Sequence, residues 1–401
     1  MTAINGPILF NATTGSDTAA SGLGPSVAVI GSSAELDGTS TVDVSFDGVS
    51  LSSISSGDLL YCSTSSGRQF SIIASVDTVN ETITTDDAWP TESGVSWAVG
   101  GKRATFDGSV QIFSDWYGGW IVETETDQTV AIDLRANFVG GTANNNVEIR
   151  CNNKTITQTL NSFWTAIFAL PQHCTVKDAV LTTSLASGGM LLGTLGNGSG
   201  GRLVENVHID ATLGGGGLTY CAYMGRDALF RNCSFKNGSY GVYAVWFQEF
   251  NNCLFDSNTN NGAFVSHHGG FTNCIFSNNG SHGLLTGSSR YQFVFSCIAY
   301  NNGGDGFNVP GTIDGLAQFI NNIASENTGY GYNFPTAQSN PVIECVDYNN
   351  TSGRITGNYM DMDGITLTED LFIDAANGDF NLNALVDGGQ TLRSTNFTMG
   401  G

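Results

Sequence analysis

Three copies of one motif follow one another in this chain, FRNC at 230–233, FNNC at 250–253 and FTNC at 271–274. Related blocks continue as VFSC at 294–297, INN at 320–322 and IEC at 343–345. The last residue of each block marks one repeated position, which one earlier copy also contains. This position is held by Val207, Cys233, Cys253, Cys274, Cys297, Asn322 and Cys345, and successive members are 26, 20, 21, 23, 25 and 23 residues apart. A sequence repeat of this length indicates that one structural unit is copied and stacked.

Each unit is too short for a strand, a helix and a second strand, so its strands must connect through loops. Such units coil into a parallel β-solenoid, in which each turn pairs with the next about 4.8 Å away, and the chirality of parallel crossovers predicts a right-handed coil. Leucine-rich repeats share the period but require regularly spaced leucines, whereas Phe, Cys, Asn and Gly hold the fixed places here. The asparagines that recur five residues after the cysteine position predict a hydrogen-bonded ladder inside the turns, made of Asn258, Asn279, Asn302, Asn327 and Asn350.

The composition restricts the partners of the chain. Among 401 residues only 14 are Lys or Arg, and the formal net charge is −22, so no basic stripe is available for nucleic acid. No window approaches 18 uninterrupted apolar residues, and the N-terminus lacks a basic region followed by an apolar core. We therefore expect no membrane span and no Sec signal. If the protein acts outside a cell, it must leave by another route, such as assembly into a virus particle followed by lysis.

Nine cysteines raise the question of disulfides or metal. Five of them hold the repeat column, and no CxxC pair occurs, so we interpret them as buried free thiols that act as small apolar side chains. The pair His267-His268 lacks an evident third ligand. We expect no metal and no cofactor.

The pattern changes along the chain and predicts four segments. Residues 1–25 form an N-terminal arm, and residues 26–104, with alternating strands and turns, form a small antiparallel β-domain that docks to a partner. Residues 105–350 form the solenoid, whose first part, 105–119, has the spacing of a short amphipathic capping helix. Residues 351–401 do not repeat and are expected to cap the other end.

The x-N-C and N-N-G turns of residues 105–385 resemble the right-handed parallel β-helix proteins of the pectate-lyase-like superfamily. A β-rich N-terminal domain followed by GKRATFDGSVQIF and a β-helix, without a signal peptide, is similar to the layout of phage tailspikes and other virion β-helix proteins. This resemblance implies the all-β fold, assembly as a homotrimer and contact with other virion proteins through the N-terminal region.

The catalytic patterns of that superfamily do not transfer to this chain. The only adjacent aspartates, Asp86-Asp87, precede the repeats, and no Arg-x-Lys occurs in the rungs. One outward-facing column is left as a candidate for binding a sugar, formed by Tyr240, Asn261, His282, Asp305 and Tyr330. In it His282 and Asp305 are weak candidates for a general acid and base, and Glu326 in another column is a third. Turn positions of a solenoid carry polar residues in any case, so the pattern fits an ordinary polar turn as well.

These features predict a structural or attachment protein of a phage-like virus particle, tailspike- or fibre-like, at the virion surface and able to bind host surface polysaccharide. A polysaccharide-degrading tailspike, a lyase or a glycoside hydrolase, is the alternative. A bacterial adhesin or filament subunit, extracellular or at the cell surface, is the third hypothesis.

Overall fold

The computed structural model describes residues 7–10, 29–65, 67–99, 121–130, 147–159, 166–170, 172–183, 189–194, 201–212, 220–287, 291–310, 317–343, 345–362 and 364–394. The expected capping helix at 105–119 and most of the arm at 1–25 lie outside this part of the chain. Two compact units form, residues 1–160 with 171–180 and residues 161–170 with 181–401. In the described part of the chain, no helix is long and apolar enough to cross a membrane.

The N-terminal β-domain is a closed antiparallel barrel, which confirms the predicted fold class for this part. Its strands pair in the order β2-β3-β6-β5-β4-β7. They are β2 (Val29–Asp37), β3 (Thr41–Asp43), β4 (Leu59–Thr64), β5 (Gly67–Asp77), β6 (Thr82–Thr85) and β7 (Thr91–Val99). Alternate residues point inward, so Leu60, Ile73 and Trp97 fill the core at no more than 1% exposure.

Four further strands of the first unit pair in parallel. They are β1 (Pro7–Phe10), β8 (Ile121–Thr124), β9 (Gln128–Val130) and β10 (Val147–Gln158). β1 and β10 both pair with β8, and the end of β10 pairs with β9. Strand β12 (Cys174–Thr183) follows in sequence.

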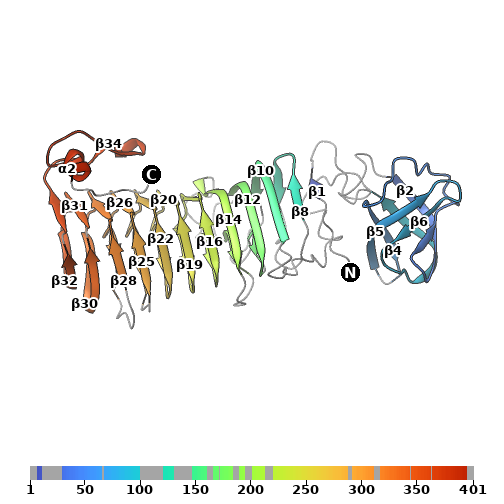
Figure 1. Ribbon diagram of the computed structural model, residues 1–401, viewed down its shortest axis with the longest axis horizontal. Coiled ribbons are helices and arrows are strands. Elements are labelled where there is room, and N and C mark those ends of the chain that lie inside the picture. The colour runs from blue at the N-terminus through green and yellow to red at the C-terminus, as the bar shows by residue number, and fades with distance from the viewer. Residues whose placement is uncertain are drawn as a thin grey trace. The chain divides into compact units, whose positions relative to one another are not determined.

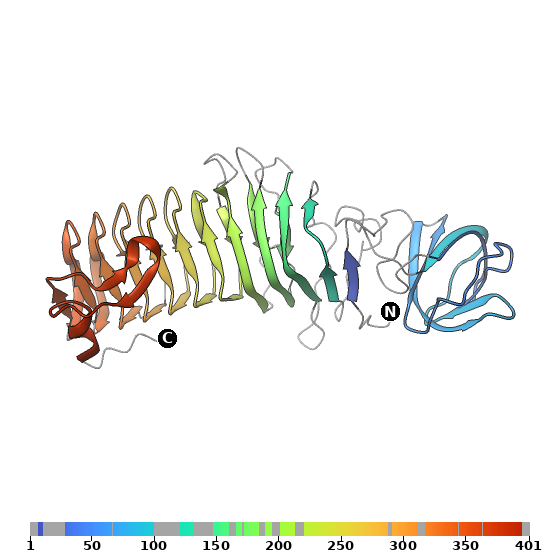
Figure 2. The same cartoon turned by 90° about the horizontal axis from the view of Figure 1, so that it is seen from above.

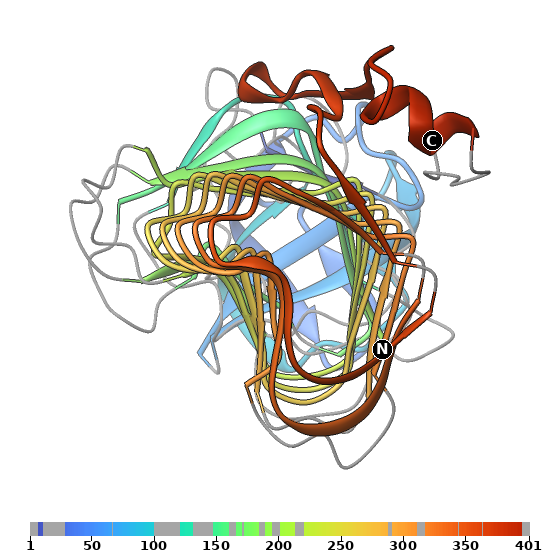
Figure 3. The ribbon, with the colours of Figure 1, turned by 90° about the vertical axis from the view of Figure 1, so that its left-hand side faces the viewer.

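The second unit is a solenoid with three parallel sheets, one on each side of the coil (Figures 1 and 3). Sheet 1 contains β14 (Arg202–Asp210), β16 (Ala228–Arg231), β19 (Gln248–Asn251), β22 (Gly269–Thr272), β25 (Gln292–Phe295) and β28 (Ala317–Ile320). Sheet 2 contains the end of β14, β17 (Ser234–Lys236), β20 (Leu254–Asp256), β23 (Ile275–Ser277), β26 (Ile298–Tyr300), β29 (Ile323–Ser325), β31 (Val346–Tyr348) and β33 (Ile365–Leu367). Sheet 3 contains β11 (Phe168–Leu170), β13 (Met190–Thr194), β15 (Tyr220–Met224), β18 (Tyr240–Ala244), β21 (Ala263–Val265), β24 (Leu284–Thr286), β27 (Phe307–Asn308), β30 (Tyr330–Ile343, which also reaches sheet 1) and β32 (Gly353–Met362).

The bore of the solenoid is filled by phenylalanine columns. In sheet 1, Phe230, Phe250 and Phe271 stack with ring centroids 4.8 and 4.9 Å apart, a distance set by the strand spacing. The column that begins with Phe235 and Phe255 in sheet 2 does the same at 5.1 Å. All five rings are fully buried, so two Phe residues per turn, one from each sheet, give these rungs the same apolar contact with the next.

The turns explain why asparagine recurs in the repeat. In the described turns from Asn206 to Asn321, the residue before the cysteine position adopts a left-handed backbone, as in Asn232 at φ 53° and Asn252 at φ 54°, and asparagine tolerates this conformation well. Further along, Asn279 donates from Nδ2 to Asn302 Oδ1 at 2.9 Å, and Asn302 donates to Asn327 Oδ1 at 2.8 Å. The same contacts link Asn258 to Asn279 and Asn327 to Asn350, which makes a continuous buried ladder.

Glycine is required beside this ladder. A Cβ on Gly262 would lie 2.6 Å from the carbonyl oxygen of Gly283 and 2.8 Å from Asn279 Nδ2, so a larger residue would separate the rungs. All nine cysteines are buried free thiols. Those of the repeat column donate to backbone carbonyls, as Cys274 Sγ does to Phe250 O and Thr272 O, both at 3.3 Å.

The C-terminal tail packs in a different place from the expected end cap. Residues 353–367 add β32 and β33 to the solenoid. The elements that follow lie against the outer face of sheet 2 (Figures 2 and 3). They are β34 (Phe372–Asp374), the short helix η3 (Ala375–Asn377), β35 (Asp379–Leu382) and α2 (Gly389–Ser394). There Leu371, Phe372 and Leu392 cover a stripe of outward-facing aliphatic side chains that includes Ile298 and Ile323. This stripe interrupts the usual alternation, and the tail is what keeps it from water.

Candidate functional site

The column predicted from the sequence lies where the strands of sheet 3 begin. Three of its side chains accept a hydrogen bond from the backbone N–H of the next member. His282 N donates to Asn261 Oδ1 at 3.0 Å, Asp305 N to His282 Nδ1 at 2.9 Å, and Tyr330 N to Asp305 Oδ1 at 2.7 Å. Three different residue types therefore perform one task, which is to satisfy a backbone donor at each turn.

Asp305 is buried, whereas the sequence suggested an exposed turn position; it is only 5% exposed. Its Oδ2 accepts from Asn308 Nδ2 at 2.6 Å and from Asn333 Nδ2 at 2.8 Å, and lies 3.4 Å from His282 Nδ1. Asp305 and His282 do meet, as the column register required. The carboxylate is nevertheless engaged on both oxygens, which leaves it little capacity for a ligand.

Two further candidates, Tyr240 and Glu326, contact other residues. Tyr240 belongs to a group of tyrosine rings with Tyr220, Tyr223 and Tyr243 on the outer face of sheet 3, with centroids 5.2–6.1 Å apart. Glu326 occupies a left-handed turn position at φ 57°. Burial, together with the Glu326 carboxylate beside it, raises the pKa of Tyr300 to about 12.

We expect His282 to make the protein less stable in acid. Burial lowers the pKa of His282, an effect that Asp305 partly opposes, and Nδ1 must stay unprotonated to accept from the Asp305 N–H. The stability that unprotonated His282 contributes to the fold is therefore present above the ordinary histidine pKa of about 6.5, and it is lost as the pH falls below that value. His282→Asn keeps an acceptor, as Asn261 shows, but does not titrate. Unfolding midpoints at pH 7.5, 6.5 and 5.5 should decline less in this variant than in the wild type.

The exposed His208 provides the control for that measurement. His208→Asn should leave the decline at low pH as steep as in the wild type. If His282→Asn and the wild type lose stability in parallel, the histidine is not the group responsible.

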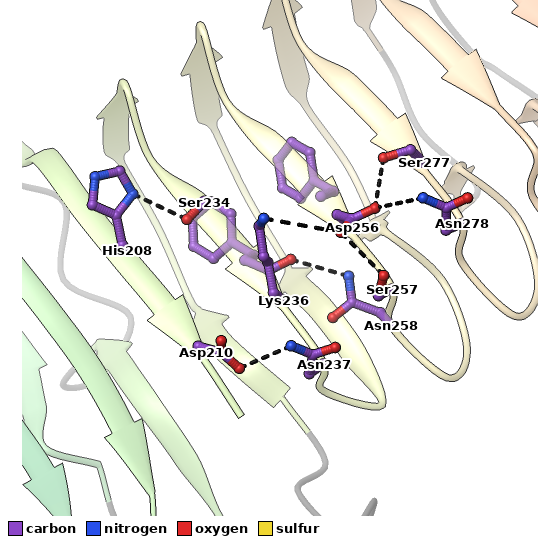
Figure 4. Close-up of polar contacts among 12 residues, drawn as sticks. His208, Asp210, Ser234, Lys236, Asn237, Asp256, Ser257, Asn258, Ser277 and Asn278 are labelled. Atoms are coloured by element: carbon purple, nitrogen blue, oxygen red, sulfur yellow. Dashed lines mark hydrogen bonds and ion pairs between the residues drawn. The ribbon is translucent and has the colours of Figure 1, made fainter. Parts of the chain in front are cut away.

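Outward-facing polar residues of sheet 2 satisfy one another (Figure 4). Asp256 Oδ1 accepts from Ser277 Oγ at 2.8 Å and from Asn278 Nδ2 at 2.9 Å, and its other oxygen lies 4.0 Å from Lys236 Nζ. Such exposed contacts contribute at most about 1 kcal/mol each.

A groove lies at the corner between sheet 3 and sheet 1. Its volume is about 830 Å³. The lining comes from five successive rungs of sheet 1, between Gly201 on β14's rung and Phe293 on β25. At about 4.8 Å per rung, the groove follows the coil axis for about 19 Å, which is long enough for an extended ligand.

Stacked rings form one wall of the groove. Phe247 lies on His268 with centroids 4.2 Å apart and an angle of 5° between the rings, and His268 lies 5.3 Å from Tyr291. Beside them Trp246 stacks on His267 at 3.6 Å. The end members of the first stack are the exposed ones, Phe247 at 49% and Tyr291 at 45%. Because His268 covers Phe247 from the following rung, the other face of Phe247 is directed toward the preceding rung.

Hydrogen-bond acceptors line the rest of the groove. Asp227 precedes Phe247 by one rung, since Ala228 pairs with Gln248. On the sheet itself Glu249 and Phe293 flank Gly270, whose missing side chain leaves a notch in the outer surface. A Cβ there would meet nothing closer than 3.5 Å.

Sequence reasoning missed this groove because its residues do not share one repeated type. One signal was present: Trp246-Phe247 and His267-His268 are aromatic or imidazole pairs 21 residues apart, one repeat. Both histidines are accounted for by ring stacking. Among the described residues, no group of three His, Cys, Asp or Glu side chains is placed to hold a metal ion.

The comparisons with known proteins agree with the fold. Residues 221–372 match the family described as "Right handed beta helix region", so this part of the chain is a right-handed parallel β-helix. No curated protein matches the chain.

Three solved structures are similar at low identity. The lacto-N-biosidase of family GH136 from Eubacterium ramulus is 9% identical with a TM-score of 0.41, over 66% of this chain and 64% of that one. The A-module of the mannuronan C-5 epimerase from Azotobacter vinelandii is 12% identical with a TM-score of 0.36, over 66% and 94%. The tailspike protein of Pseudomonas phage LKA1 is 12% identical with a TM-score of 0.23, over 87% and 63%. At these values the likeness concerns the fold alone.

Proposed function

We propose that this protein is an attachment protein that holds a surface glycan in the groove between sheet 3 and sheet 1. The observation that carries the proposal is the exposure of Phe247 and Tyr291 at the two ends of a ring stack inside that groove. Exposed aromatic side chains beside carboxylates suit a sugar, since the ring covers the apolar face of the pyranose and the carboxylates accept from its hydroxyl groups.

The β-helix supports this function by its rigidity. The rungs of the groove are fixed by paired backbone and by buried apolar side chains, and from Asn258 onward also by the asparagine ladder, so the groove is formed before the ligand arrives. A preformed site loses little conformational entropy on binding.

We propose, in line with the sequence analysis, that the protein acts at a virion surface as a homotrimer, and that segment 26–104 docks it to other virion proteins. This arrangement, with one segment for docking and another for glycan binding, is that of a tailspike or tail fibre. A micrograph of the parent particle labelled by antibody to the barrel would test the location.

We expect Phe247→Ala to weaken binding to host surface polysaccharide at least tenfold, because the ring lies between the ligand and His268. A tenfold loss corresponds to about 1.4 kcal/mol. Biolayer interferometry on immobilised polysaccharide measures it. Phe46→Ala is the matched control, since Phe46 is 66% exposed in the barrel and should be silent. Equal losses in both variants, or no binding by the wild type, would refute the proposal.

Cleavage of the glycan is the second candidate function, and the two carboxylates of the groove, Asp227 and Glu249, favour it. Release of reducing ends by the wild type, lost in Glu249→Gln, would show cleavage, and saturated products would identify a hydrolase. Unsaturated products would show a lyase. Binding without new chain ends would leave attachment as the function.

A further inference from the structure

We infer that the groove selects an uncharged or amine-bearing glycan and rejects polyanionic chains such as polyuronates. This inference rests on the proposed function and concerns the ligand class of the same groove. It follows from an imbalance between acceptors and donors in the lining.

Acceptors dominate the groove. Glu249 is exposed and Asp227 half-buried, and both line it. Gln248 does not add to them: it is 1% exposed, shares the inward side of β19 with Phe250, and donates from Nε2 to Trp246 O at 2.6 Å.

The cation that lines the groove is buried and directed at backbone carbonyls. Arg202 is the one Lys or Arg in the lining, and it is 2% exposed. Its Nε donates to Leu170 O at 3.2 Å and its Nη1 to Arg226 O at 2.7 Å. The Arg226 guanidinium lies over the Trp246 ring, 5.5 Å from its centroid, and does not line the groove.

The ligand must therefore bring donors. Hydroxyl groups donate to a carboxylate, and an ammonium group donates and pairs with its charge. A sugar carboxylate or sulfate brings acceptors only, and it would lie against Asp227 and Glu249 without a counter-charge. The net charge of −22 adds long-range repulsion of polyanions at low ionic strength.

Three oligosaccharides of equal length test the inference on the full chain: a neutral glucan, a glucosamine oligomer with free amines, and an oligogalacturonate. Titration calorimetry at 50 mM salt should give the neutral or amine-bearing ligand at least tenfold tighter binding than the uronate. Glu249→Gln should weaken the glucosamine oligomer at least fivefold. The same change at Glu369, an exposed carboxylate of the tail, should alter none of the three affinities.

The outcomes separate the inference from the function beneath it. Tightest binding of the oligogalacturonate, lost in Phe247→Ala, would keep the glycan site and overturn the inference. If neither the three oligosaccharides nor host polysaccharide bound, both the inference and the proposed function would be overturned. Binding of the glucosamine oligomer that Glu249→Gln leaves unchanged would overturn the role given to the groove carboxylates.

Discussion

Replacement of Asn302 by Leu is expected to lower the free energy of unfolding by about 3 kcal/mol or more. Asn302 Nδ2 donates to Phe276 O at 3.0 Å, and its Oδ1 accepts from Asn279 N at 3.1 Å, in addition to the contacts along the ladder. Leucine makes none of these bonds, so several buried groups lose their partners at about 1–3 kcal/mol each. Denaturant unfolding followed by circular dichroism measures the change.

The control for this variant is Thr328→Leu. Thr328 is exposed, lies beside the ladder residue Asn327 and also exchanges a polar side chain for leucine. It should change stability by less than about 0.5 kcal/mol. Similar midpoints for the two variants would show that the ladder does not stabilise the fold.

Asp305→Ala is expected to destabilise the β-helix to a similar extent, about 3 kcal/mol. An exposed turn residue, as the sequence suggested, would be nearly silent, but burial reverses that expectation. Alanine leaves the Tyr330 N–H and the amides of Asn308 and Asn333 without their acceptor.

Asp305→Asn serves as the partner variant. Its side-chain oxygen still accepts from the Tyr330 N–H, as Asn261 does from His282, while its NH2 group faces two other amides. We expect an intermediate loss of stability. If Asp305→Ala unfolds like the wild type while glycan binding disappears, the residue belongs to a binding site and the structural interpretation is wrong.

The periodic part of this molecule was predictable from the sequence. The blocks around Cys233, Cys253 and Cys274 repeat the same buried positions, and any residue type that recurs at the repeat period must stack. The alternation of residues in 26–104 was likewise enough to predict the antiparallel β-domain. These features arise from local rules that each repeat obeys separately.

The groove and the tail were not predictable in the same way. The groove depends on where Phe247, His268 and Tyr291 point at a corner, and these residues differ in type from rung to rung. The burial of Asp305 depends on Asn308 and Asn333, whose positions the simple column did not include. The tail lies against sheet 2 because Ile298 and Ile323 face outward, a departure from alternation that has meaning only once the sheets are placed.

The buried thiols affect how this protein can be handled. Burial raises the pKa of Cys233, Cys253, Cys274 and Cys345, so in the folded chain these four thiols present almost no thiolate to an oxidant. Once unfolded, nine ordinary thiols are exposed together on one chain. Air oxidation would then form disulfides between cysteines that lie on separate rungs of the folded solenoid, and a chain cross-linked in this way could not refold. Refolding from denaturant should therefore succeed with a reductant present and fail without one.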